Sequence, residues 1–180
     1  MANVWHDVEV GKNSPDFVNT IIEIPKDSKL KYELDKDSGL LKLDRFLYSS
    51  VHYSGDYGFI PRTLCEDDDP LDVFIISHRP TYPMTLCEVK VLGVMKMVDD
   101  GESDDKIIGV HNADPRFSQW ENLEDVPEHF IEELKEFMRT YKRLENKQVD
   151  VNEIYGKEEA KKIINESIEI YNKHFSQNSE

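Results

Sequence analysis

The sequence predicts an α+β protein that is mainly β, with a small barrel of short strands followed by two helices. Up to about residue 115, short runs of β-branched and aromatic residues alternate with turn-forming residues. After that point the apolar residues recur at helical spacing. The 180 residues, of which 38% are hydrophobic, suit a single core. We therefore expect one domain over residues 1–180, with a barrel core at about 17–115 and helices at about 126–145 and 157–175.

The strand candidates begin with residues 17–24, a run rich in β-branched side chains that stops before Pro25. The run Asp37-Ser38-Gly39 consists of turn formers and predicts a hairpin between the next two candidates. Several short strands at this spacing favour a small barrel. The further strand candidates are residues 29–34, 40–45, 73–77, 86–97 and 106–111.

Two amphipathic helices are expected after the barrel. Residues 125–128, Asp-Val-Pro-Glu, carry the chemistry of a helix start. The first helix then continues to about Leu144 and includes Tyr141 and Lys142 near its end. A second helix is predicted from about Lys157 to Phe175. Their apolar stripes are Phe130, Leu134, Phe137, Met138, Tyr141 and Leu144 in the first, and Ala160, Ile163, Ile164, Ile168, Tyr171 and Phe175 in the second.

The overall charge limits the possible partners. The chain carries 37 acidic residues against 22 Lys and Arg, a formal net charge of −15. Nucleic-acid binders usually present a basic face, so no nucleic-acid partner is expected.

The amino terminus has no signal-peptide pattern, and no segment approaches the roughly 18 apolar residues of a membrane span, so we expect a cytoplasmic protein without a membrane partner. Cys65 and Cys87 lack zinc-site spacing and fit a reducing compartment.

The run from Asp67 to Asp72, Asp-Asp-Asp-Pro-Leu-Asp, places four carboxylates directly before the apolar segment 73–76. Like charges held this close disfavour one another's ionised forms, so the fold must supply divalent metals, basic side chains or shifted protonation. Pro70 stiffens the turn and Leu71 anchors it to a core, which favours a rigid ligand platform. The alternative is a solvated acidic surface turn.

A second acidic run, from Asp99 to Lys106, follows the longest strand candidate. Loops at one end of a closed barrel face the same mouth, so the two runs could converge. Oxygen ligands from both would then suit a site for several Mg²⁺ ions. A flexible acidic hairpin tip is the alternative for this run alone.

Basic and phenolic side chains in these otherwise acidic or apolar surroundings point to phosphate chemistry. Each of them has an ordinary structural role open to it, such as a strand residue with its charged head in solvent. Together with two carboxylate loops, however, they supply cationic donors for phosphate oxygens and metals that neutralise charge. These residues are Lys31, Arg45, Tyr53, Tyr57, Lys106, Tyr141 and Lys142.

A set of landmarks occurs in order over nearly the whole chain. They are Glu23-Ile24-Pro25, Lys31-Tyr32-Glu33, Asp44-Arg45-Phe46, Tyr53 with Tyr57-Gly58-Phe59-Ile60-Pro61, the run from Asp67 to Val73, Gly93 to Met97, Asp99 to Lys106, and Tyr141-Lys142. In this pattern the chain resembles the soluble family I inorganic pyrophosphatases, especially their compact prokaryotic and plant-like form. One position departs from the family pattern: Asp56 replaces the asparagine common before Tyr57 and adds an acid beside a tyrosine expected to handle phosphate.

The resemblance implies an OB-like, five-stranded closed β-barrel with two flanking α-helices. It also implies an inorganic diphosphatase, which hydrolyses pyrophosphate to two orthophosphates with a metal-activated water. The expected cofactor is Mg²⁺, several ions per active site, for which Mn²⁺ or other divalent ions can substitute. Members of this form are typically hexamers, so the resemblance suggests a homohexamer here.

The resemblance also implies a role for each site residue. By similarity, Asp67, Asp72 and Asp104 hold the activating metals, while Asp99 and Glu23 serve the metals that arrive with substrate. Asp69 is then the candidate general base. Glu33 is expected to orient the residues that contact the metals or the substrate. The phosphate groups are expected to contact Lys31, Arg45, Lys106, Tyr141 and Lys142, with Tyr57 donating to a phosphate oxygen and Tyr53 shaping the pocket.

Three other functions remain open from the sequence. One is a hydrolase of another small diphosphate. A second is an OB-fold module that binds oligonucleotides, against which the acidic loops argue. The third is a non-catalytic metal-binding module, but the twelfth position of a loop starting at Asp67 is His78, where a calcium-binding EF-hand needs glutamate. The six histidines show no helical ligand pair and are interpreted as packing or surface groups.

Overall fold

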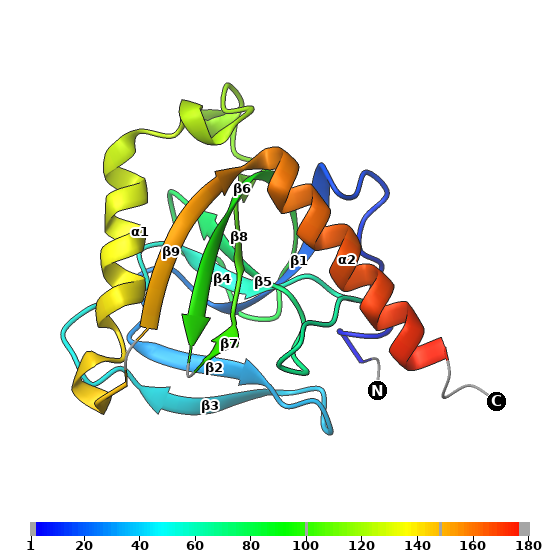
Figure 1. Ribbon diagram of the computed structural model, residues 1–180, viewed down its shortest axis with the longest axis horizontal. Coiled ribbons are helices and arrows are strands. Elements are labelled where there is room, and N and C mark those ends of the chain that lie inside the picture. The colour runs from blue at the N-terminus through cyan, green and yellow to red at the C-terminus, as the bar shows by residue number, and fades with distance from the viewer. Residues whose placement is uncertain (1–2, 100, 148, 177–180) are drawn as a thin grey trace.

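Five strands close a barrel in the computed structural model, which describes residues 3–99, 101–147 and 149–176. Around the barrel, each strand pairs with the next and the last returns to the first. Among the strands of the described residues, only β5 and β8 run parallel, so both begin at the same end of the barrel (Figure 1). The predicted mainly β barrel with two helices is confirmed. In order around the barrel, the strands are β1 (Phe17–Ile24), β4 (Asp56–Phe59), β5 (Asp72–Ile76), β8 (Lys106–His111) and β6 (Leu86–Asp99).

Strand β4 was not among the sequence-based candidates, although it completes the barrel. It has only four residues, and one of them is Gly58, which weakens any strand signal. The glycine is required by the packing, because a Cβ at this position would lie 1.9 Å from the carbonyl oxygen of Ile21 on β1. Close approach of β1 and β4 therefore depends on a residue that strand propensity counts as unfavourable.

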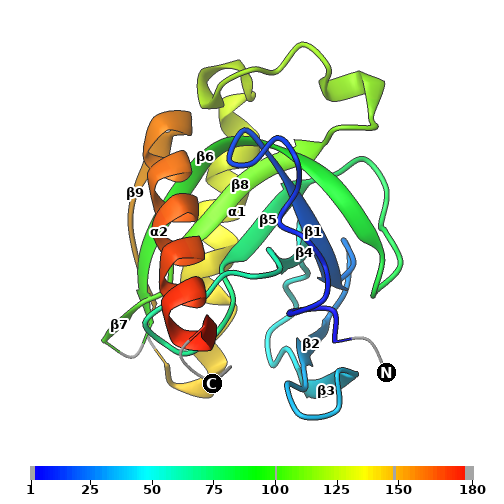
Figure 2. The same cartoon turned by 90° about the vertical axis from the view of Figure 1, so that its right-hand side faces the viewer.

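Two predicted strands lie outside the barrel, in a two-stranded ribbon made of β2 (Leu30–Leu34) and β3 (Leu41–Phe46). The predicted hairpin turn between them is confirmed, since Leu34 pairs with Leu41 and the Asp35 amide donates to the Leu40 carbonyl at 2.8 Å. In both views the ribbon lies at one end of the barrel (Figure 1, Figure 2). It can therefore cover the barrel mouth.

The long strand β6 has more partners than the sequence indicated. Its first half pairs with β1, and its second half pairs with β9 (Val149–Gly156), which lies after the first helix. Strand β9 was not predicted from the sequence. Half of its eight residues are exposed, and its pairing with β6 supplies stability that its side chains do not. The two-residue strand β7 (Glu102–Ser103) extends β6 as a tight hairpin around Gly101.

Helices cover two sides of this sheet. Helix α2 (Lys157–Ser176) packs on β6 and buries Ala160 and Ile164 against the barrel core (Figure 2). Helix α1 (Glu128–Thr140) packs against β9. None of the helices in the described part of the chain combines the length and apolar character needed to cross a membrane. Three short 3-10 helices lie at Pro115–Phe117, Leu123–Asp125 and Arg143–Glu145.

The first helix ends earlier than its apolar pattern predicts. Tyr141 is its carboxyl-terminal cap, and Lys142 lies in the turn before the 3-10 helix Arg143–Glu145. The placement of both residues within the helix is therefore wrong. The apolar spacing continued past the end because Tyr141 is buried in the same core cluster as the helix side chains.

Candidate active site

The ribbon, the barrel mouth and the segment after α1 enclose a cleft of about 650 Å³. Both acidic runs line this one cleft, as the sequence suggested, although Asp100 lies outside the described residues. Among the described residues, ten acidic side chains and five lysines line it. The excess of negative charge means that the cleft attracts cations, and the lysines give it donors for an anion.

The parallel pair β5 and β8 places a carboxylate beside a lysine at the barrel mouth. Asp72 and Lys106, the first residues of the two strands, pair in register. The Lys106 ammonium lies 2.5 Å from Asp72 Oδ2, also forms an ion pair with Asp104, and is almost completely buried. Burial disfavours its charge, but Asp72 and Asp104 together raise the pKa of Lys106 above its usual range. Lys106 is therefore a permanent cation between two carboxylates.

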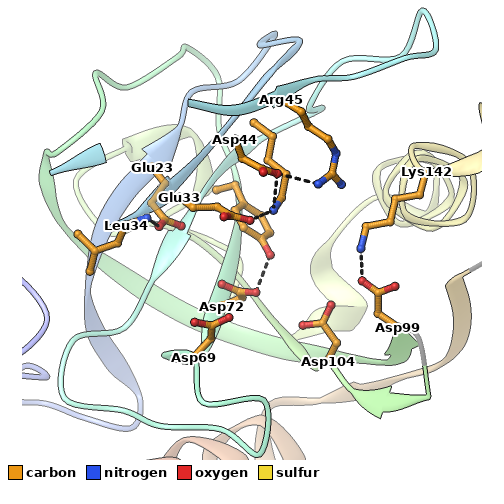
Figure 3. A network of polar contacts seen from close by, with 12 residues as sticks. Glu23, Glu33, Leu34, Asp44, Arg45, Asp69, Asp72, Asp99, Asp104 and Lys142 are labelled. Carbon is orange, nitrogen blue, oxygen red and sulfur yellow. Dashed lines mark hydrogen bonds and ion pairs between the residues drawn. The ribbon is translucent and has the colours of Figure 1, made fainter. Parts of the chain in front are cut away.

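Tyr57 approaches the same carboxylate from β4. Its hydroxyl donates a hydrogen bond of 2.7 Å to Asp72 Oδ2 (Figure 3). Burial raises the pKa of Tyr57 well above its ordinary value, with Asp72 adding to the effect. The phenol therefore stays protonated at neutral pH and can donate a hydrogen bond.

The acidic loop before β5 holds its carboxylates with backbone hydrogen bonds. The Asp69 amide donates to Asp67 Oδ1 at 3.1 Å, and the Asp69 carbonyl accepts from the Cys65 amide at 2.8 Å. Asp68 adopts a left-handed backbone conformation, with φ 64°, and is exposed. Burial raises the pKa of Asp67 to about 6. Asp69 and Asp72 lie close together in the site (Figure 3).

Lys36, which the sequence analysis missed, ties the ribbon turn to this loop. Its ammonium lies 2.5 Å from Asp69 Oδ1 and donates to the Asp68 carbonyl at 2.7 Å. No local pattern marks Lys36, because the contact joins two loops that only the fold brings together. Lys42, Asp35 and Asp37 also line the cleft and were not predicted, and Glu102 belongs to the second acidic run but was not assigned a role of its own. The sequence signal that could have found these residues is their position on or near two hairpin turns.

The far wall of the cleft pairs Lys142 with Asp99, the last residue of β6 (Figure 3). This ion pair occupies one carboxylate oxygen of Asp99. The other, Oδ1, is buried and has no hydrogen-bond partner among the described residues. A buried carboxylate oxygen without a partner is costly, and a bound cation would satisfy it.

Glu23 lies at the inner edge of the cleft, at the end of β1. Its Oε1 accepts a hydrogen bond of 2.8 Å from the Leu34 amide on the ribbon. Burial raises the pKa of Glu23 to about 8, with the nearby Asp72 adding to the effect. On the same ribbon, Lys31 forms an ion pair with Glu33 and lies 3.6 Å from Asp44 Oδ2.

Two of the predicted substrate contacts, Arg45 and Tyr53, are not among the residues that line the cleft. Tyr53 is buried behind Tyr57, with ring centroids 5.6 Å apart, so it supports that ring rather than facing a ligand. Arg45 is opposite Lys31 on the ribbon, and Lys31 does line the cleft. Arg45 therefore lies beside the cleft.

Asp56, the position that departs from the family pattern, is not among the residues that line the cleft. Successive strand residues point to opposite faces, so Asp56 points away from the side that Tyr57 occupies. Its buried carboxylate accepts from His111 Nε2 at 2.9 Å and from the Lys26 and Thr81 amides at 2.7 Å and 3.1 Å. His111 is thus an ion-pair partner rather than an ordinary packing or surface group.

The described residues contain no group of three His, Cys, Asp or Glu side chains arranged as a finished metal site. Lys106 instead separates Asp72 from Asp104. The donor set nevertheless fits hard divalent cations, because it consists of carboxylate oxygens and includes the unpartnered Asp99 Oδ1.

Comparison with known proteins identifies the family. The model of the family described as inorganic pyrophosphatase matches residues 20–172. The soluble inorganic pyrophosphatase 2 of Chlamydomonas reinhardtii is 48% identical over 97% of this chain and 91% of its own length. The soluble inorganic pyrophosphatase 1 of Arabidopsis thaliana is 46% identical over 94% of this chain and 80% of its own. The crystal structure of the inorganic pyrophosphatase from Thermus thermophilus superposes with a TM-score of 0.91 at 40% identity, covering 94% of this chain and 99% of that one. The chain therefore belongs to the inorganic pyrophosphatase family.

Proposed function

We propose that this protein hydrolyses inorganic pyrophosphate to two orthophosphates and that it requires divalent cations, with Mg²⁺ as the natural one. The observation that carries the proposal is the convergence of two carboxylate loops with lysines and a buried tyrosine in one cleft. A diphosphate needs its charge neutralised, its oxygens held by donors and a water activated beside it. Family membership gives the same reaction.

The carboxylates would hold the cations in two groups. Asp67, Asp72 and Asp104 surround the buried Lys106 end of the cleft and are assigned to the activating ions. Asp99 and Glu23 lie at the two edges and are assigned to ions that enter with substrate. When bound, divalent cations neutralise the diphosphate and make water more acidic, and Mn²⁺ can replace Mg²⁺ because both prefer oxygen ligands.

Asp69 is assigned as the general base. Its carboxylate is exposed to the cleft and held by Lys36 at 2.5 Å, so one oxygen remains free to accept a proton from the attacking water. The water oxygen then bonds to one phosphorus, and the bond between that phosphorus and the bridging oxygen breaks. Pro70, directly after Asp69, limits the directions in which the carboxylate can point.

The cationic and phenolic side chains bind the phosphate groups. Lys31, Lys106 and Lys142 donate to phosphate oxygens, as do the Tyr57 and Tyr141 hydroxyls, which burial keeps protonated by raising the pKa of both. Each lysine exchanges part of its carboxylate contact for the substrate. Glu33 holds Lys31 in place, Tyr53 supports Tyr57 from behind, and Arg45 joins these donors from beside the cleft.

Orthophosphate release from pyrophosphate tests the proposal directly. The purified protein is assayed with Mg²⁺, after addition of a chelator, and again after Mg²⁺ is restored. We expect rapid release that the chelator abolishes and Mg²⁺ restores. A panel of organic diphosphates in the same assay should give little release. No release by folded, Mg²⁺-supplied protein, or equal rates on the panel, would contradict the proposal.

The proposal extends to a cytoplasmic enzyme that assembles as a homohexamer. What supports the assembly, besides the family resemblance, is a set of apolar side chains that the single chain leaves exposed. Tyr82 is 86% exposed and Phe46 61%, and Leu86 and Tyr48 are also more than half exposed. Subunit contacts would cover such side chains.

A further inference from the structure

Arg45 is held by two carboxylates that lie outside the cleft. Its Nε donates to Glu145 Oε1 at 3.0 Å, and its Nη1 donates to Asp44 Oδ2 at 2.7 Å. Neither carboxylate is among the residues that line the cleft. The third guanidinium nitrogen, Nη2, is buried and has no hydrogen-bond partner among the described residues. Two of the three nitrogens are therefore fixed by the protein, and the remaining one is left unpaired by the described residues.

The Glu145 contact joins distant parts of the chain at the edge of the site. Arg45 lies on β3 of the ribbon, and Glu145 lies 100 residues later, at the end of the 3-10 helix Arg143–Glu145. Three residues before it, Lys142 forms the ion pair with Asp99. The segment with Tyr141 and Lys142 is thus attached to the ribbon on one side and to β6 on the other. In Figure 3 the guanidinium projects from the ribbon toward the side of the site that carries Lys142.

Without the ion pair to Glu145, the Arg45 side chain would not remain available to the substrate. The cleft beside it is lined by ten carboxylates, and an arginine pairs readily with any of them. Capture by Asp99 or Asp104 would remove a donor from the phosphate and a ligand from the cations. Glu145 is a suitable holder because its side chain is only 9% exposed, so solvent screens the pair little and its position is fixed.

We infer that Glu145 is a positioning residue for the pyrophosphate reaction, which holds the Arg45 guanidinium through Nε so that Nη2 is presented to a phosphate oxygen of the substrate. The inference rests on the proposed function and adds a residue to it. Glu145 acts only through Arg45. A buried donor without a partner costs free energy in the free protein, and the phosphate oxygen would satisfy it.

A double-mutant cycle between Glu145 and Arg45 tests the inference. In the wild-type background we expect Glu145→Ala to lower kcat/KM for Mg²⁺-pyrophosphate about tenfold, the size expected for one hydrogen bond to a charged group. Glu145→Gln keeps a carbonyl oxygen for Nε and should recover most of that loss. In the Arg45→Gln background, Glu145→Ala should change kcat/KM by less than about twofold, because the group on which it acts is gone.

A matched control removes an ion pair of similar length whose two residues do not line the cleft. Glu159 pairs with Lys96 at 2.6 Å between α2 and β6, and Glu159→Ala should leave kcat/KM unchanged. The NMR signal of the Arg45 Nε–H gives a readout independent of activity: it should be protected from exchange in the wild type and in Glu145→Gln, and lose protection in Glu145→Ala.

The outcomes separate the inference from the proposed function. If the effects of the Glu145 and Arg45 substitutions simply multiply, Glu145 has a structural role of its own and the inference is overturned. If Glu145→Ala leaves kcat/KM unchanged, it is overturned as well. Should Glu145→Ala fail to fold, the same cycle with Glu145→Gln and Glu145→Leu decides between these results. An inactive wild type would overturn the proposed function and this inference with it.

Discussion

The two ends of the barrel differ in whether the protein itself supplies partners for their buried charged groups. Strands β5 and β8 run from one end to the other: they begin at Asp72 and Lys106 in the cleft, and β8 ends at His111 at the opposite end. There the buried Asp56 carboxylate has three hydrogen-bond donors, from His111 and two backbone amides. Both of its oxygens are satisfied by the protein itself.

At the cleft end, some buried polar groups lack such partners among the described residues. Asp99 Oδ1 and Arg45 Nη2 are buried without a partner in the described part of the chain, and Lys106 is shared between two carboxylates. Buried polar groups normally find partners, and leaving them unpaired costs stability. The difference indicates that the Asp56 end stabilises the fold, whereas the cleft end keeps donors and acceptors free for cations and a diphosphate. The comparison predicts that substitutions at the two ends affect different properties.

The largest effect on activity is expected for Asp72→Asn. Asp72 contacts both Lys106 and Tyr57, and the change removes a charged ligand assigned to the activating cations. We expect kcat/KM to fall on the order of 1,000-fold, since even residues that only hydrogen-bond to metal ligands typically contribute 10–100-fold. The Mg²⁺ concentration needed for half-maximal activity should rise in parallel.

Steady-state assays across a Mg²⁺ titration, together with calorimetric Mg²⁺ binding, measure both quantities. Asp150→Asn, on an exposed position of β9, is the control and should match the wild type. An unchanged Mg²⁺ dependence in Asp72→Asn would remove Asp72 from the cation ligands.

A smaller loss, in turnover alone, is expected for Asp69→Asn. An amide cannot accept the proton of the attacking water, so kcat should fall about 100-fold, the lower range for general-base catalysis. Mg²⁺ binding and the midpoint of thermal unfolding should stay close to wild type, because Asp69 is exposed. The neighbouring exposed Asp68→Asn serves as control. Near-full turnover by Asp69→Asn would assign the base to another group or to solvent.

The smallest effect on activity, and a clear one on stability, is expected for His111→Gln. Burial disfavours the imidazolium, but interactions with Asp56 and Cys87 together outweigh this and raise the pKa of His111 from 6.5 to about 9. A folded pKa above the unfolded value means that the pair's stabilisation is complete below about pH 6.5 and is lost as the pH rises through about 9. Asp56 has a lowered pKa despite its burial, so its contribution is lost only in acid.

Urea unfolding of wild type and His111→Gln measures this difference. At pH 6 the variant should be less stable by about 2 kcal/mol, and at pH 10 the gap should nearly close. Its kcat/KM at pH 7 should stay within about twofold of wild type, which sharpens the contrast with the cleft. His129→Gln, at an exposed position of α1, controls for the loss of a histidine. A gap that is constant between pH 6 and pH 10 would contradict the ion-pair interpretation.

The sequence predicted most of the barrel because four of its strands carry long β-branched or apolar runs. Strand β4 was not predicted, because its Gly58 is required by the close approach of the Ile21 backbone. Local strand propensity takes no account of such a contact. The ribbon strands were located correctly along the chain, yet their separation from the barrel depends on pairing, which sequence spacing does not reveal. The end of α1 was missed because Tyr141 continues the buried pattern without continuing the helix.

The sequence alone was enough to predict the chemistry of this protein: two carboxylate runs anchored by apolar strands, and the lysines and tyrosines that a diphosphate needs. These are properties of residue types and of short spacings, which local sequence carries. Which of these groups are neutralised and which stay free depends on long-range contacts in the folded chain. The Lys36–Asp69, Arg45–Glu145 and Asp56–His111 contacts join residues 33, 100 and 55 positions apart, and such contacts exist only after the chain has folded. Because a charged group's behaviour depends on its partners and burial, its role is settled by that long-range geometry.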